Sequence, residues 1–158
     1  MIGDRGSRIA GGMTRFYDLE AANAAVPELD GIVSVLAEQR AELVRLRDVV
    51  LAGTGGGDGG TTTVAERRPG TGDEVRVDDL RLTRLRMQGL IDQMAAGVAR
   101  IDALGLTLRD IEHGLVDFPA LVSGRQIWLC WQRGETAIGW WHGLDTGFAD
   151  RRPLDELA

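Results

Sequence analysis

The side chains best suited to chemistry gather toward the C-terminal end of the chain. The single cysteine (Cys130), both histidines (His113 and His142) and all four tryptophans lie between residues 113 and 142. Histidine and carboxylate side chains are common ligands of zinc, iron and manganese. We therefore consider a metal site formed by His142, His113, Asp117 and Glu135, with Cys130 as a further candidate ligand.

Two alternatives to this metal site stay open. The same histidines could hold the iron of a haem group, or they could simply form hydrogen bonds within a core. The chain contains no HxxH, HxxxH or CxxC spacing. No local motif therefore selects the metal site over the alternatives.

The composition excludes several other kinds of catalytic site. All eighteen basic residues are arginine, so there is no lysine for a Schiff base with pyridoxal phosphate or for a phosphate-binding P-loop. Only three serines are present, and none stands in the Gly-x-Ser-x-Gly motif of serine hydrolases. Cys130 remains as the candidate nucleophile.

Charge and hydropathy narrow the range of partners. The formal net charge is −6, and both signs are spread along the chain, whereas nucleic-acid binding needs a positive surface. No apolar run approaches the ~20 residues of a membrane-spanning helix, and a single cysteine cannot form an intrachain disulfide. We therefore expect a cytoplasmic protein that binds neither nucleic acid nor membranes.

The sequence predicts one domain with a short leader and a short tail. Residues 1–13 lack hydrophobic periodicity and are expected to be a disordered leader, while residues 14–154 form the domain and residues 155–158 the tail. A glycine-rich stretch predicts a flexible linker at about residues 53–76.

A long amphipathic helix is predicted before this linker. Asp18 is a good N-cap for a short helix, residues 19–26, which we expect to end before Pro27. The long helix then begins at Pro27, which suits a first helical turn. Its predicted buried face follows a seven-residue repeat and comprises Leu29, Ile32, Leu36, Gln39, Leu43, Leu46 and Val50.

A second long helix is predicted after the linker. We expect it to begin near Asp78 and to end at Leu104 and Gly105, because glycine commonly terminates helices. Its predicted apolar face comprises Leu80, Met87, Ile91, Met94, Val98 and Ile101. Two such helices joined by a flexible linker should pack antiparallel.

Two short aromatic strands, residues 127–131 and 138–142, predict a β-hairpin. We expect a two-residue turn at or beside Gly134. Side-chain alternation then puts Cys130 and His142 on opposite faces, which argues against a Cys–His catalytic dyad. The predicted tryptophan pairs are Trp131 with Trp140 on one face and Trp128 with Trp141 on the other.

The tryptophans on both faces predict a partner. A helical hairpin can cover only one face of a small sheet, and monomers rarely expose a large aromatic patch. We therefore expect a homodimer, formed through the helices or the sheet, or a small ligand or protein partner bound at this hairpin. The predicted ligand or partner surface comprises Asp117, Arg125, Trp128, Cys130, Trp131, Glu135, Trp140, Trp141, His142 and Arg151.

Several motifs occur in an order that is typical of a known family. They are Tyr17-Asp18-Leu19-Glu20-Ala21-Ala22-Asn23 with Pro27, Gly114-Leu115-Val116-Asp117-Phe118-Pro119, Leu129-Cys130-Trp131, Gly134-Glu135, Trp141-His142, Gly147-Phe148 and Arg151 to Pro153. From about Phe16 to Leu154 the chain resembles the domain of unknown function 2203. The resemblance implies a compact α+β protein and no particular activity. Family members carry an acidic residue after the Trp-His pair, where this chain has Gly143.

The expected fold class is α+β, an antiparallel helical hairpin packed on a small antiparallel β-sheet. Three functions remain open within it. The first is a non-catalytic binding or interaction module that uses the aromatic hairpin as its contact surface. The second is a small metal- or cofactor-dependent enzyme that uses His142 with Asp117 or Glu135. The third is a purely structural helical adaptor in which the hairpin is only core.

Overall fold

A computed structural model describes residues 15–55 and 72–157, so the expected leader and most of the expected linker lie outside the described residues. Two long helices, α1 (Leu19–Thr54) and α2 (Gly72–Ala103), precede the sheet. The strands are β1 (Thr107–Asp110), β2 (Leu115–Val122), β3 (Arg125–Gln132), β4 (Trp140–His142) and β5 (Arg152–Pro153), and two short 3₁₀ helices are η1 (Phe148–Asp150) and η2 (Leu154–Leu157). The predicted α+β class with a helical hairpin is confirmed.

Helix α1 is continuous through Pro27, so the predicted break at this proline is wrong. The predicted N-cap is present, because the Asp18 carboxylate accepts a hydrogen bond from the backbone N–H of Ala21 at 2.7 Å. Ala22 and Val26 before the proline are buried, as is Leu29 after it. Burial on both sides of Pro27 stabilises one helix despite the hydrogen bond that proline removes.

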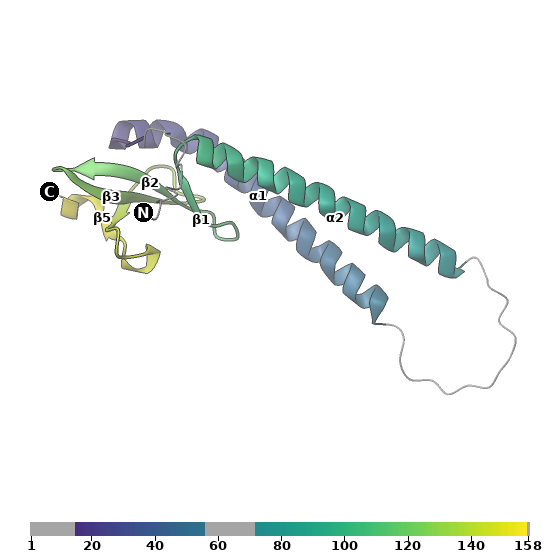
Figure 1. Ribbon diagram of the computed structural model, residues 1–158. Helices are drawn as coiled ribbons and strands as arrows, with labels where there is room; N and C mark the ends of the chain where they lie inside the picture. Colours follow the sequence, from purple (N-terminus) through teal and green to yellow (C-terminus); the bar gives the residue numbers. More distant parts are fainter. Residues whose placement is uncertain (1–14, 56–71, 158) are drawn as a thin grey trace, which may run out of the picture.

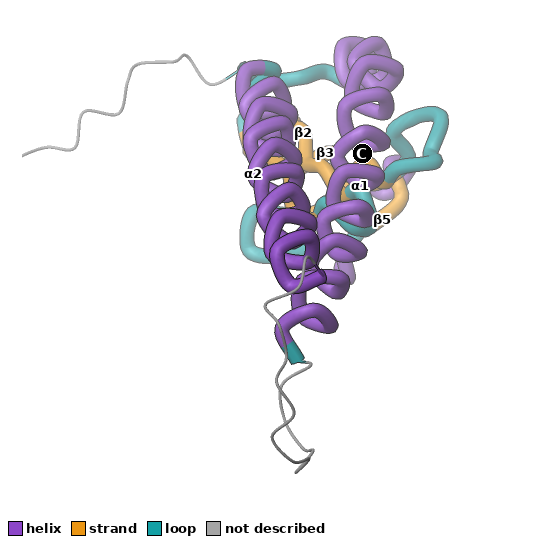
Figure 2. Tube along the Cα trace, turned by 90° about the vertical axis from the view of Figure 1, so that its right-hand side faces the viewer, coloured by secondary structure: helices purple, strands orange, loops and turns teal. Residues whose placement is uncertain are grey.

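Helix α2 begins at Gly72, six residues before the predicted start at Asp78. Its predicted end is confirmed, since Gly105 adopts a φ of 74° and the Leu106 N–H donates a hydrogen bond to the Ile101 carbonyl oxygen. Figure 1 shows α1 and α2 side by side, running on beyond the sheet. In Figure 2, where this extension points toward the viewer, the sheet lies behind the helices.

The seam between the helices follows most of the predicted repeat. On α1, Leu29, Ile32 and Leu36 are buried. On α2, Ile91 was expected in the seam but is 45% exposed, so this prediction is wrong. Gly97 lies in the seam instead: a Cβ atom there would stand 2.8 Å from Leu36 Cδ2, so glycine permits the close approach of the helices.

The sheet has the order β1-β2-β3-β4-β5, and every neighbouring pair is antiparallel. A tight turn at Ser123 and Gly124, with φ angles of 51° and 74°, joins β2 to β3. Strand β2 continues through Pro119, whose carbonyl accepts a hydrogen bond from the Tyr17 N–H at 2.7 Å. The residues of β2 that pair with β1 extend only as far as Asp117. Pro119 lies beyond them, so the N–H group that proline lacks interrupts no hydrogen-bond ladder between β1 and β2.

One face of the sheet forms the core with the helices. Val116, Phe118, Ile127, Leu129 and Trp131 from this face are buried in the same cluster as residues of α1. Antiparallel pairing puts directly opposed side chains on one face, so the residues between these core positions point to the other face. Among the described helices, none is both long and apolar enough to cross a membrane.

Candidate metal centre

The register of β3 and β4 puts Cys130 and His142 on the same face of the sheet. Trp128 pairs with His142 and Cys130 pairs with Trp140, while Asp117 on β2 pairs with Cys130. The prediction that Cys130 and His142 lie on opposite faces is therefore wrong. Seven residues, 133–139, separate β3 from β4 in place of a two-residue turn, and this shifts the alternation by one position.

Each face still carries two tryptophans, but the predicted pairs are wrong. Trp131 and Trp141 lie on the core face, whereas Trp128 and Trp140 lie on the opposite face beside Cys130. Both tryptophans of this outer face are half-buried. They form the walls around the buried polar side chains of that face.

Asp117, Cys130 and His142 form the centre of the outer face. One ligand atom from each lies within 4.8 Å of the others, and no other such group of three is found in residues 15–55 and 72–157. Asp117 is 2% exposed, Cys130 0% and His142 3%. Adjacent strands of one rigid sheet therefore bring together a carboxylate, a thiol and an imidazole from positions 117, 130 and 142.

Both ring nitrogens of His142 face oxygen atoms. Nδ1 lies 2.9 Å from the carbonyl oxygen of Gly143, and Nε2 lies 3.0 Å from Asp117 Oδ2. A carbonyl oxygen can only accept, so Nδ1 carries a proton and donates it. Nε2 either carries a second proton that points to the Asp117 carboxylate or directs its lone pair to a cation. In metal-binding histidines, the other ring nitrogen commonly donates a hydrogen bond to a backbone carbonyl, as Nδ1 does here.

The thiol of Cys130 is protonated at neutral pH in the metal-free protein. Burial raises the pKa of Cys130 to about 12, and the negative charges of Asp117 and Glu135 and a hydrogen bond to Asp117 add to this effect against the opposing charge of Arg151. A thiol in this state is a poor nucleophile. A bound metal ion would instead deprotonate it and hold it as a thiolate.

Arg109 supports Asp117 and was not predicted from the sequence. Its Nε donates a hydrogen bond of 2.8 Å to Asp117 Oδ2, and its guanidinium carbon lies 5.1 Å from the centre of the Trp128 ring. The register between β1 and β2 shifts between Leu108 and Asp110. Arg109 lies at this shift and contacts Asp117 on the neighbouring strand. No spacing in the sequence indicates such an irregularity.

Glu135 and Arg151 lie beside the centre and pair with each other. Arg151 Nη1 donates to Glu135 Oε1 at 3.1 Å, and its guanidinium lies 4.5 Å from the centre of the Trp140 ring. The second Glu135 oxygen accepts the backbone N–H of Gln132 at 2.9 Å. Glu135, a predicted metal ligand, thus stabilises the β3–β4 connection and is not part of the three-residue group.

The remaining predicted site residues lie elsewhere. His113 is exposed in the turn between β1 and β2, where its Nδ1 lies 2.8 Å from Asp110 Oδ2. The hydrogen bond and negative charge of the Asp110 carboxylate raise the pKa of His113. Trp131 is buried, and its indole donates to the Glu135 carbonyl at 2.9 Å. Arg125 and Trp141 line a separate open cleft of about 660 Å³.

Comparison with known proteins places this arrangement in a family. Neither the curated proteins nor the solved structures compared with the chain give a match. The model of the family described as uncharacterized conserved protein DUF2203 matches residues 15–154, which include the helical hairpin, the sheet and the Asp117, Cys130 and His142 group. The chain belongs to the DUF2203 family.

Proposed function

We propose that this protein binds a divalent transition-metal ion through Asp117, Cys130 and His142. The observation that carries the proposal is the convergence of three different ligand atoms within 4.8 Å at buried positions of adjacent strands. Ligands that stand 2.0–2.3 Å from a tetrahedral ion lie roughly 3.3–3.8 Å apart. Small side-chain rotations would bring these three groups to that spacing.

The surroundings of the three side chains support the same proposal. The Gly143 carbonyl fixes the ring of His142 with Nε2 directed at the group, and Arg109 orients the carboxylate of Asp117. Outer contacts of this kind fix ligand orientation in known metal sites. The half-buried Trp128 and Trp140 lie next to these ligands and limit the access of water.

The ligand set favours a small ion of intermediate softness. Thiolate, imidazole and carboxylate together suit zinc or ferrous iron. Three protein ligands leave a fourth position for water or a substrate, which is the coordination of catalytic zinc sites. Two functions fit this proposal: a metal-binding module without catalysis, and a metal-dependent enzyme. Both use the same three ligands.

Cobalt(II) titration of the chelator-treated protein tests the proposal. We expect one cobalt ion per chain and a near-ultraviolet band of thiolate-to-cobalt charge transfer. Cys130→Ser should abolish this band. His142→Ala should weaken affinity by more than roughly 100-fold, which exceeds the 10–100-fold typical of outer contacts.

His113→Ala is the matched control because it removes the other histidine, which is exposed and hydrogen bonded to Asp110. This variant should bind cobalt like the unchanged protein. Circular dichroism establishes that each variant is folded. Cobalt binding without the charge-transfer band in the unchanged protein, or equal losses in His113→Ala and His142→Ala, would overturn the proposal.

A further inference from the structure

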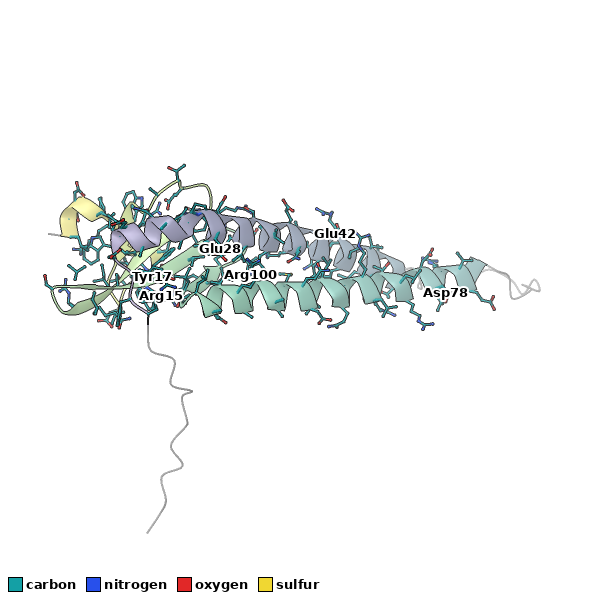
Figure 3. The ribbon with its side chains drawn as sticks, turned by 90° about the horizontal axis from the view of Figure 1, so that it is seen from above. Arg15, Tyr17, Glu28, Glu42, Asp78 and Arg100 are labelled. Atoms are coloured by element: carbon teal, nitrogen blue, oxygen red, sulfur yellow. The ribbon has the colours of Figure 1, made fainter. Side chains whose placement is uncertain are left out.

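The open cleft that Arg125 and Trp141 line has a volume of about 660 Å³, which is the size of a small-molecule site. Its lining residues come from β3, β4 and β5 and from the connection between β4 and β5, and none of them belongs to α1 or α2. In Figure 3 the C-terminal segment, drawn in yellow, lies at the other end of the molecule from Glu42 and Asp78. The cleft is therefore formed by the sheet and its last connection, without the helices.

Two arginines of the cleft stand on the core face of the sheet. Trp141 pairs with Leu129 on one side and with Arg152 on the other. Directly opposed residues share a face, and so does every second residue along a strand. Arg125 and Ile127 on β3 therefore project from the same face as Trp141 and Arg152. Ile127 and Trp141 belong to the hydrophobic core, so the two guanidinium groups stand beside an apolar floor.

The connection from β4 to β5 forms the opposite wall of the cleft and carries acidic groups. Asp145, Thr146 and Asp150 from this connection line the cleft. The Thr146 hydroxyl accepts a hydrogen bond of 3.1 Å from the Gly143 N–H, which closes a turn at the start of the connection. This wall is thus held in shape by a contact of its own, and a ligand would meet a preformed surface.

The charged side chains of the cleft balance in number but do not pair. There are two arginines and two aspartates in the lining, and among residues 15–55 and 72–157 none of these four forms an ion pair. The guanidinium carbon of Arg152 lies 5.9 Å from the centre of the Trp141 ring, a cation–π distance that keeps this group over the floor. Guanidinium groups bind carboxylates, and carboxylates accept hydrogen bonds from ammonium groups.

We propose that this cleft binds a small zwitterion with an apolar body, the chemistry of a short apolar peptide with free ends. Its carboxylate pairs with Arg152 and Arg125, and its ammonium group pairs with the aspartates of the opposite wall. Its apolar side chains cover Ile127 and Trp141 and contact Leu144, which is 53% exposed in the free protein. A ligand with only one sign of charge would meet like charges in the lining, which disfavours its binding.

Calorimetric titration of the full chain with leucyl-leucine tests this proposal. No metal is added, so the amine of the peptide has no metal ion to bind. We expect one peptide per chain with a dissociation constant below about 1 mM. N-acetyl-leucyl-leucine lacks the ammonium group and leucyl-leucinamide lacks the carboxylate, so each should bind at least about tenfold more weakly. Absence of saturation by leucyl-leucine up to about 10 mM, or equal affinity for a blocked peptide, would overturn the proposal.

Arg152→Gln should weaken the binding of leucyl-leucine at least about tenfold, because it removes a guanidinium group from the floor of the cleft. Arg133→Gln is the matched control, since Arg133 is also exposed and does not line the cleft. This variant should bind the peptide like the unchanged protein, and circular dichroism establishes that both variants are folded. Equal weakening by the two variants would contradict the assignment of the cleft.

Amide chemical shifts measured by nuclear magnetic resonance locate the bound peptide. Leucyl-leucine should shift the amides of residues 125–127 and 143–146, which line the cleft. The amides of residues 37–54, which lie on α1 and outside the lining, should stay unchanged. Shifts confined to residues outside the cleft would overturn the proposal, and neither this readout nor the titration depends on the metal centre.

Discussion

At the residue scale, Cys130 determines how metal binding should depend on pH. Its pKa is raised to about 12 by burial and by Asp117 and Glu135, so the metal-free protein holds a neutral thiol. Binding as a thiolate must release this proton. Below the pKa, the apparent affinity should therefore rise at least about tenfold for each unit of pH. Calorimetric titration with zinc between about pH 7 and 9, in buffers of different ionisation enthalpy, measures both the affinity and the protons released.

The matched variant for this experiment is Cys130→Ala. It should release one proton fewer and show a correspondingly weaker pH dependence, because the thiol is gone while Asp117 and His142 remain. An affinity that stays constant over this range in the unchanged protein would show that Cys130 is not a ligand.

Two of the four predicted metal ligands, Asp117 and His142, belong to the three-residue group, as does the further candidate Cys130. Residue type alone indicated these three residues, because a thiol, an imidazole and a carboxylate seldom occur close together in this sequence. His113 and Glu135 satisfied the same criterion but lie in turns with their own partners. The register of β2, β3 and β4 decides which of these side chains meet, and the sequence alone does not determine that register.

At the element scale, the connection from β1 to β2 depends on glycine at position 114. Gly114 has a φ of 67°, and an added Cβ would lie 2.5 Å from Arg133 Cβ and 2.9 Å from Val33 Cγ1. Gly114→Ala should therefore lower the free energy of unfolding by roughly 2–4 kcal/mol through backbone strain and overpacking. Chemical denaturation followed by circular dichroism measures the loss.

Gly124→Ala separates these two contributions. Gly124 has a similar φ of 74°, but nothing lies within 4 Å of an added Cβ. We expect a loss of only about 1–2 kcal/mol from the backbone strain. Equal losses for the two variants would show that the contacts of Gly114 with Arg133 and Val33 do not matter.

The helices could be predicted better than the hairpin, for a physical reason. A seven-residue repeat such as Leu29, Leu36 and Leu43 extends over many turns, and it defines a seam even where single positions such as Ile91 are placed wrongly. The alternation of a strand depends on one turn, and an error of one residue reverses every side chain. The longer connection at residues 133–139 caused such a reversal for Cys130 relative to His142.

At the scale of the whole molecule, the two proposed sites use opposite faces of the sheet. Asp117, Cys130 and His142 lie on the outer face, whereas Arg152 and the floor of the cleft lie on the core face. The effect of Arg152→Gln should be confined to peptide binding, with the metal content of each chain unchanged.

The most direct test of the metal centre is the native mass spectrum of the protein purified without chelators and equilibrated with zinc. We predict a mass of one polypeptide plus one metal ion for each chain, retained in His113→Ala and lost in a folded His142→Ala variant. The bare polypeptide mass for the unchanged protein under these conditions would contradict the account. Asp117, Cys130 and His142 would then form a buried structural network that holds the strands together.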